Sequence, residues 1–98
     1  DFTKTVALSD DFVVAYNNRG LAFMEQNKLT EAVQDFTTAV TLKPDYALSY
    51  FNRALAHEAQ NRPWEALQDA KKAYQCQSSN LEYYTKYKKL RALIESML

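Results

Sequence analysis

The 98-residue sequence contains very little of the residue types on which common catalytic and metal-binding motifs depend. Its single glycine, Gly20, excludes glycine-rich phosphate loops, because these need at least two glycines. Its single cysteine, Cys76, excludes an internal disulfide and a cysteine cluster for zinc. Its single histidine, His57, excludes a two-histidine metal motif. We therefore expect no catalytic residues, no metal site and no cofactor among these residues.

An excess of charge of one sign is also missing. Twelve lysine and arginine residues balance twelve aspartate and glutamate residues, so the formal net charge is zero. Proteins that bind nucleic acids or anionic membranes need a surplus of basic charge, so we expect no nucleic-acid partner. No apolar run is long enough to span a membrane and no signal peptide opens the sequence, which predicts no membrane insertion and an intracellular, cytoplasmic location.

The strongest pattern in the sequence is a repeat of 34 residues. When Val13–Tyr46 is set over Ala47–Asn80, 12 of the 34 positions are identical. The same shift sets Asp1–Phe12 over Asp35–Tyr46 with 6 of 12 positions identical, whereas Leu81–Leu98 keeps a single identity with the unit before it. The pattern predicts one domain over 1–98: the last part of one unit (1–12), two whole units (13–46 and 47–80) and a divergent tail (81–98).

Each whole unit is predicted to be a helical hairpin. Apolar residues recur at helical spacing on both sides of a polar break, Gln26-Asn27-Lys28, in which asparagine supplies the helix-ending conformation that glycine often gives. Pro63 suits the first turn of a helix, and Pro44 stops a helix at the residue before it. Small residues recur where the two helices must approach closely: Gly20 and Ala54, Ala32 and Ala66, Ala39 and Ala73.

The period, the alternation of small and large residues and the terminal Pro44 resemble the tetratricopeptide repeat (TPR) over the whole chain. The resemblance implies an all-α fold, a right-handed α-solenoid of antiparallel helical hairpins, with two full repeats, a preceding half repeat and a C-terminal capping helix. Three residues depart from the family pattern and are expected to weaken individual contacts: His57 for an aromatic residue, Ala70 for a bulky one and Ser78 for a proline. We expect His57 to be a packed structural histidine and Cys76 a small core residue.

The tail is predicted to be the helix that ends the solenoid. Ser79-Asn80-Leu81-Glu82 has the pattern of a capping box. The expected apolar face of this helix comprises Leu81, Tyr84, Tyr87, Leu90, Ile94 and Met97. Lys88 stands at the register of Gly20, and Arg91 stands at that of Phe23. Because a bulky cation does not fit a close helix crossing, we expect no helix to pack against Lys88 and Arg91.

The resemblance also implies that the first helix of each hairpin lines a concave groove. We expect this groove to hold a peptide segment of a partner protein, which makes the chain a non-catalytic protein–protein interaction module, a scaffold or adaptor. The expected partner-binding residues are Val14, Asn17, Asn18, Leu21, Met24, Leu48, Phe51, Asn52, Leu55, Lys86 and Lys89, with Glu25, Glu58, Glu82 and Thr85 beside them.

Two features of this groove have alternative interpretations. Asn18 and Asn52, at equivalent places one repeat apart, either hydrogen-bond the backbone of an extended peptide or tie neighbouring helices together. The basic residues of the tail are either a solvated face or a means of steering an acidic peptide to one end of the groove: Lys86, Lys88, Lys89 and Arg91.

The family's two-carboxylate clamp, which holds the acidic C-terminus of a chaperone, is matched only in part. Asn52 and Lys86 agree with clamp residues. Asn17, Leu21 and Glu82 stand where the clamp has lysine, asparagine and lysine, and the carboxylate of Glu82 repels the group that a clamp holds. We therefore expect no such clamp in this chain.

Two further interpretations stay open. If 1–12 is the second helix of a truncated repeat, the apolar face of Phe2, Val6 and Leu8 is exposed, which favours self-association or packing within a longer array. The other interpretation is a targeting domain of a larger enzyme or co-chaperone.

Overall fold

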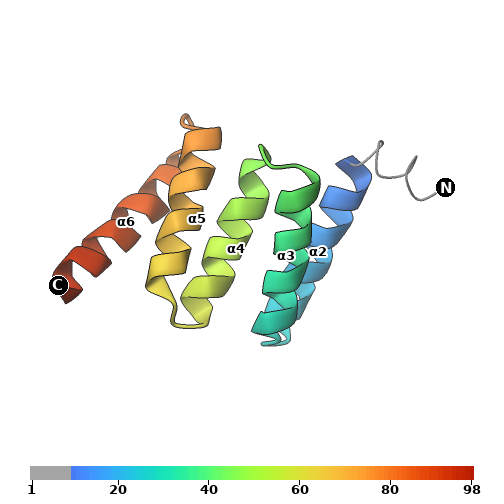
Figure 1. Cartoon of the computed structure of the whole chain (residues 1–98), viewed down its shortest axis with the longest axis horizontal. Coiled ribbons are helices and arrows are strands. Elements are labelled where there is room, and N and C mark those ends of the chain that lie inside the picture. The colour runs from blue at the N-terminus through green and yellow to red at the C-terminus, as the bar shows by residue number, and fades with distance from the viewer. Residues whose placement is uncertain (1–9) are drawn as a thin grey trace.

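The computed structural model describes residues 10–98, and within them the chain forms α-helices and no strand (Figure 1). The helices are α2 (Asp10–Glu25), α3 (Leu29–Leu42), α4 (Ala47–Ala59), α5 (Pro63–Cys76) and α6 (Leu81–Met97). The all-α prediction is therefore confirmed. The helix predicted at the start of the chain, with Phe2, Val6 and Leu8, lies outside the described residues.

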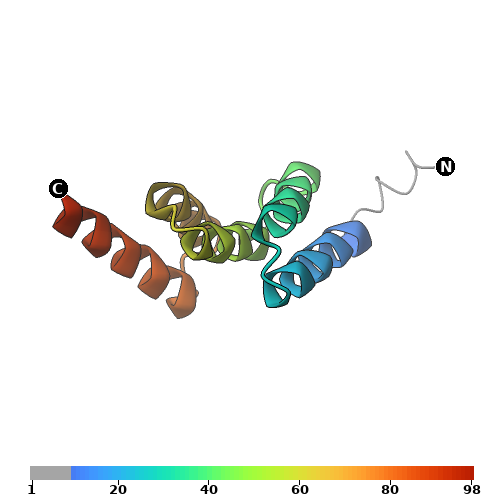
Figure 2. The same cartoon turned by 90° about the horizontal axis from the view of Figure 1, so that it is seen from below.

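Each helix packs against the next one along the chain, so the helices form a row (Figure 1). Seen from below, α3 and α5 lie on one side and α2 and α6 on the other, with α4 between them (Figure 2). The first helices of the two hairpins, α2 and α4, also contact one another directly, and Phe51 of α4 packs against Tyr83 of α6. This arrangement is the α-solenoid that the repeat predicts.

The two hairpin turns end their helices in the same way, one repeat apart. Asn27 and Asn61 adopt left-handed backbone conformations, with φ of 60° and 64°. The N–H of Lys28 donates to the carbonyl of Phe23 at 2.8 Å, and the equivalent bond from Arg62 measures 2.9 Å. These bonds pair carbonyls that the helix end leaves without partners. Asparagine tolerates this backbone better than most residues, so the predicted role of Asn27 is confirmed.

The two hairpins fill the same space with different residues. A Cβ atom on Gly20 would lie 2.4 Å from Cε1 of Phe36, so a glycine at this position leaves room for the phenylalanine ring. In the next repeat the equivalent residues are Ala54 and Ala70, and Leu90 of α6 joins both in one buried cluster. Ala70, which is expected to weaken individual contacts, thus has a leucine from the following helix packed in its cluster.

An ion pair closes each hairpin at the same register. Arg19 donates to both carboxylate oxygens of Asp35 at 2.7 Å, and Arg53 donates to both oxygens of Asp69 at 2.7 and 2.8 Å. The hydrogen bond with Asp69 raises the pKa of Arg53. Because a bidentate pair fixes the orientation of both side chains, it fastens α2 to α3 and α4 to α5.

Helix α6 buries part of the predicted apolar face: Leu90 and Ile94 are buried as predicted, and Tyr83 is buried in addition. The prediction is wrong at three exposed positions: Leu81, 74% exposed, Met97, 58% exposed, and Tyr84. The buried side of α6 at this end is the one on which Tyr83 packs against Phe51, with ring centroids 4.7 Å apart.

The start of α6 also differs from the prediction by one residue. The side-chain oxygen of Asn80 accepts a hydrogen bond from the N–H of Tyr83 at 3.2 Å, so Asn80 is the N-cap. The predicted capping box, which begins at Ser79, is therefore wrong, since asparagine caps a helix as well as serine does. Glu82 is then not the third residue after the cap and has no capping role.

The outer surface of α6 carries the two cations that the sequence places there. Lys88 lies 5.8 Å from the ring centre of Tyr84, and Arg91 lies 5.6 Å from that of Tyr87. Both cations are exposed. Among residues 10–98 no helix covers them.

Candidate functional site

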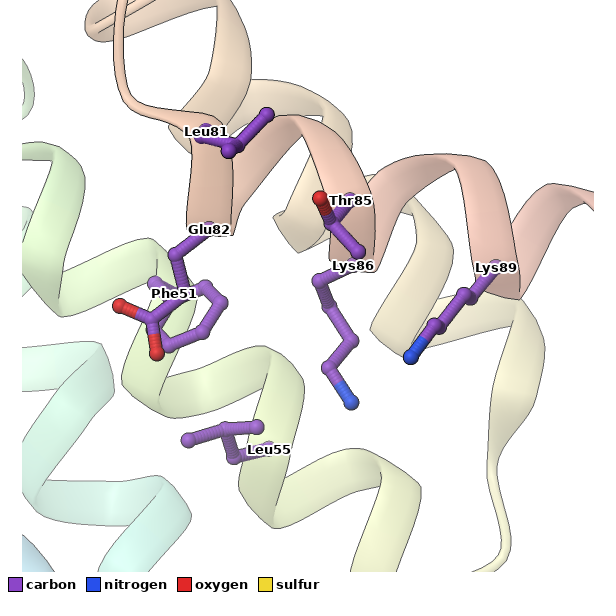
Figure 3. A pocket seen from close by; sticks show the side chains of 7 residues that line it. All are labelled: Phe51, Leu55, Leu81, Glu82, Thr85, Lys86 and Lys89. Atoms are coloured by element: carbon purple, nitrogen blue, oxygen red, sulfur yellow. The ribbon is translucent and has the colours of Figure 1, made fainter.

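A groove lies between α4 and α6 and encloses about 500 Å³ (Figure 3). Two of the residues that line it come from α4 and five come from α6: Phe51, Leu55, Leu81, Glu82, Thr85, Lys86 and Lys89. The groove thus combines apolar side chains with a few polar and charged groups, which is the usual composition of a ligand site in a protein.

The floor of the groove is part of the hydrophobic core. Phe51 is buried against Tyr83, and the half-buried Leu55 packs on the same cluster, which also includes Ala73 of α5. Burial raises the pKa of Tyr83, and the negative charge of Glu82 adds to this effect. Because three helices meet in this cluster, the floor does not move without a loss of core contacts.

One face of α6 forms the wall of the groove. Glu82 is followed three, four and seven positions later by Thr85, Lys86 and Lys89, which is the spacing of one helix face. Figure 3 shows the carboxylate of Glu82 at one end of the wall and the amines of Lys86 and Lys89 at the other. Lys86 Nζ also lies 3.0 Å from Oε1 of Glu58 on α4. The wall therefore has a carboxylate at one end and two amines at the other.

Four of the predicted partner-binding residues line this groove together: Phe51, Leu55, Lys86 and Lys89. Glu82 and Thr85, expected beside them, line it as well. Leu81 is missed by the sequence analysis, which assigns it to the buried face of α6. The signal that points to it is Asn80, since an N-cap at that residue makes Leu81 the first residue of the helix, where no preceding turn covers it.

The other apolar residues predicted for the groove lie apart from it. The exposed ones are Val14, Leu21 and Leu48. Val14 lines a separate cavity of about 220 Å³ next to the turn between α3 and α4. Met24 is half-buried and packs against the cluster of Phe36. The structure therefore does not join these residues to the cavity between α4 and α6.

The asparagines differ in their surroundings. Asn17 Nδ2 donates to Ser49 Oγ at 2.9 Å, and both residues are buried, so Asn17 ties α2 to α4. Asn52 is also buried, whereas Asn18 is exposed. Oδ1 of Asn17 and Nδ2 of Asn52 have no hydrogen-bond partner among the described residues. Asn18 and Asn52 are thus equivalent in the repeat but not in exposure.

His57 packs inside the second hairpin. Its Nε2 lies 3.7 Å from Oδ2 of Asp69 and its Nδ1 lies 3.2 Å from Oε1 of Gln60, which agrees with the predicted structural role. Cys76 is half-buried against the cluster that forms the groove floor. Within residues 10–98, no three histidine, cysteine or acidic side chains gather closely enough to hold a metal ion.

Comparisons with known proteins identify the repeat. A family model described as TPR repeat matches residues 20–61. The first TPR domain of Spaghetti (RPAP3), solved bound to the HSP90 peptide SRMEEVD, aligns with a TM-score of 0.79 at 25% identity, over 85% of this chain and 66% of that one. The chain belongs to the tetratricopeptide-repeat family. Its all-α solenoid is thereby confirmed as a TPR fold.

Two other solved TPR domains are similar to this one. The second TPR domain of Spaghetti (RPAP3), bound to the same HSP90 peptide, has a TM-score of 0.85 at 19% identity, over 95% of this chain and 85% of that one. The TPR domain of Arabidopsis OM64 has a TM-score of 0.76 at 30% identity, over 82% of this chain and 66% of that one. This TPR chain spans about two thirds of the length of the first Spaghetti and OM64 domains.

A search of curated proteins finds no match to this TPR sequence. Among residues 10–98, no helix has the length and apolar character needed to cross a membrane.

Proposed function

We propose that this TPR chain is a protein–protein interaction module, a scaffold or adaptor, that holds a peptide segment of a partner protein in the groove between α4 and α6. The observation that carries the proposal is the cavity of about 500 Å³, with its apolar floor and its charged wall. Burial of an apolar side chain there contributes about 25 cal/mol per Å² of apolar surface removed from water. Because the floor is part of the core, the groove is preformed and binding costs little ordering of the domain.

An HSP90 peptide is a second candidate, since two similar TPR domains are solved with one bound. Its sequence, SRMEEVD, brings several carboxylates. In this chain Glu82 faces the groove and repels such a peptide, and Lys86 is already paired with Glu58. Lys89 is the one groove lysine without an ion pair among the described residues. We therefore favour a partner segment with fewer acidic residues.

The division of the chain remains a proposal from the sequence. Residues 13–46 and 47–80 are two repeats, 1–12 is the second half of a preceding one, and 81–98 is a capping helix. Self-association through the first segment depends on residues outside those described.

The test is a selection of phage-displayed random peptides on the chain, followed by binding of the enriched peptides to two variants. Leu81→Glu places a charge at the mouth of the groove, and Leu93→Glu is the matched control, since it changes another exposed leucine of α6 that does not line the groove. Both side chains are exposed, so both variants are expected to fold.

The enriched peptides should bind Leu81→Glu at least about tenfold more weakly, a loss of about 1.4 kcal/mol, and Leu93→Glu as they bind the parent chain. Equal binding to the two variants contradicts the proposal, as does the absence of any enriched peptide.

A further inference from the structure

We infer that the groove between α4 and α6 selects a segment that is neutral overall but polarised: an apolar side chain with a basic residue on one side and an acidic residue on the other, about three positions apart. This inference rests on the proposed function and specifies its ligand.

The charges of the groove cancel. Glu82, Lys86 and Lys89 line it, and Glu58 of α4 pairs with Lys86 at 3.0 Å. Two carboxylates and two amines leave no net charge. A uniformly acidic or uniformly basic segment therefore gains attraction at one end of the groove and meets repulsion at the other.

These charges are separated along the groove rather than mixed. The carboxylate of Glu82 and the amine of Lys89 lie at opposite ends of the wall (Figure 3). The two residues are seven positions apart on α6, which corresponds to a rise of about 10 Å. An extended peptide covers that distance in about three residues, at about 3.3 Å each. The basic residue of the ligand would face Glu82 and its acidic residue would face Lys89.

The apolar part of the groove lies between these charges. Leu55 lies below the wall, between the carboxylate of Glu82 and the amines of the lysines (Figure 3). Together with Phe51 it offers a surface for one apolar side chain. The hydroxyl of Thr85, which also lines the groove, is able to donate and accept a hydrogen bond. The order of contacts is therefore basic, apolar, acidic.

The ion pair between Lys86 and Glu58 lowers the positive charge at the basic end of the groove. A ligand with a cluster of acidic residues is therefore attracted less strongly. The two partners of the pair are on different helices, and their side chains are 25% and 40% exposed. Glu58 already offsets part of the charge of Lys86, so Lys89, which has no carboxylate partner among the described residues, is the stronger attraction for a ligand carboxylate. One acidic residue of the ligand is enough to form an ion pair with Lys89.

The test repeats the phage selection in parallel on the parent chain and three charge variants, with the net charge of the enriched peptides as readout. Glu82→Lys makes the groove positive, and Lys89→Glu makes it negative. Lys71→Glu is the control, because it reverses an exposed lysine on α5 that does not line the groove.

We expect peptides from the parent chain and from Lys71→Glu to have a net charge near zero and opposite charges about three positions apart. Peptides from Glu82→Lys should become acidic and those from Lys89→Glu basic, each binding its own variant about fivefold better than it binds the parent chain.

The same charge composition in all four selections overturns the inference, as does enrichment of acidic clusters by the parent chain. If those peptides still lose binding to Leu81→Glu, the inference on charge fails while the proposed groove stands. If Leu81→Glu also has no effect, the proposed function fails with it.

Discussion

The amine of Lys86 on α6 lies 3.0 Å from a carboxylate oxygen of Glu58 on α4. This contact joins the two helices between which the groove lies, and it occupies a cation that an acidic ligand would otherwise use. A partly exposed pair of this kind contributes about 0–1 kcal/mol to stability. Its main effect is therefore on the charge that a ligand meets in the groove.

Glu58→Gln should release Lys86 for a ligand and leave the domain stable. We expect the peptide SRMEEVD to bind this variant about threefold to fivefold better than the parent chain, with a change in the free energy of unfolding below about 1 kcal/mol. Calorimetric titration at low salt measures the affinity. Glu95→Gln, on the part of α6 outside the groove, is the control, and an equal gain in both variants would contradict this role of Glu58.

Gly20→Ala should destabilise the first hairpin. The new Cβ would lie 2.4 Å from the ring of Phe36, and overpacking of this kind costs about 1–3 kcal/mol, more than the gain of about 1 kcal/mol in helix propensity. Urea denaturation measures the loss. In the second hairpin, Ala54 faces Ala70, so Ala54→Gly should cost about 1 kcal/mol. A more stable Gly20→Ala variant would show that the close approach to Phe36 is relaxed in solution.

Leu90→Ala should cost about 2–5 kcal/mol in the free energy of unfolding, because Leu90 is buried with Ala54 and Ala70 and neither alanine fills the cavity that remains. Leu93→Ala, three residues along α6 and half exposed, should cost much less. Thermal or urea unfolding of the two variants gives the comparison. Similar losses would mean that Leu90 does not replace the ring that the second hairpin lacks.

The stability of the domain should fall at high pH because of Tyr83. Burial raises the pKa of this tyrosine in the folded chain above its ordinary value of 10.0, so the folded state binds the proton more tightly than the unfolded state does. The resulting stabilisation is complete below pH 10 and is lost as the pH rises through the folded-state pKa. In Tyr83→Phe, urea denaturation should show a smaller loss above pH 10. An identical pH dependence in the two chains rules out this contribution.

The features of the fold that sequence reasoning predicts are those with a local cause. Asn27 ends its helix by its own backbone conformation, and Gly20 marks a close approach by its size. The orientation of α6 has no such local cause. Tyr83 and Tyr84 are both aromatic and both have an aromatic neighbour on another helix, and Tyr83, which packs on Phe51, is the one that is buried.

The groove was predictable to the extent that helical spacing determines it. Phe51, Leu55, Lys86 and Lys89 follow from the register of the repeat once the first helices line one face. The residues at the two ends of the groove do not follow from the register of the repeat, because their positions depend on how far each helix is rotated relative to the one before it. The alignment of Asn18 with Asn52 could not predict that one is exposed and the other buried, since burial depends on the neighbouring helices.

Amide chemical-shift mapping of the ¹⁵N-labelled chain with an enriched library peptide shows whether the groove between α4 and α6 binds a partner segment. We predict that the largest shifts fall on residues 51–55 and 81–89, with α3 nearly unaffected. Shifts confined to α2 and α3, with those two segments unchanged, would contradict the account.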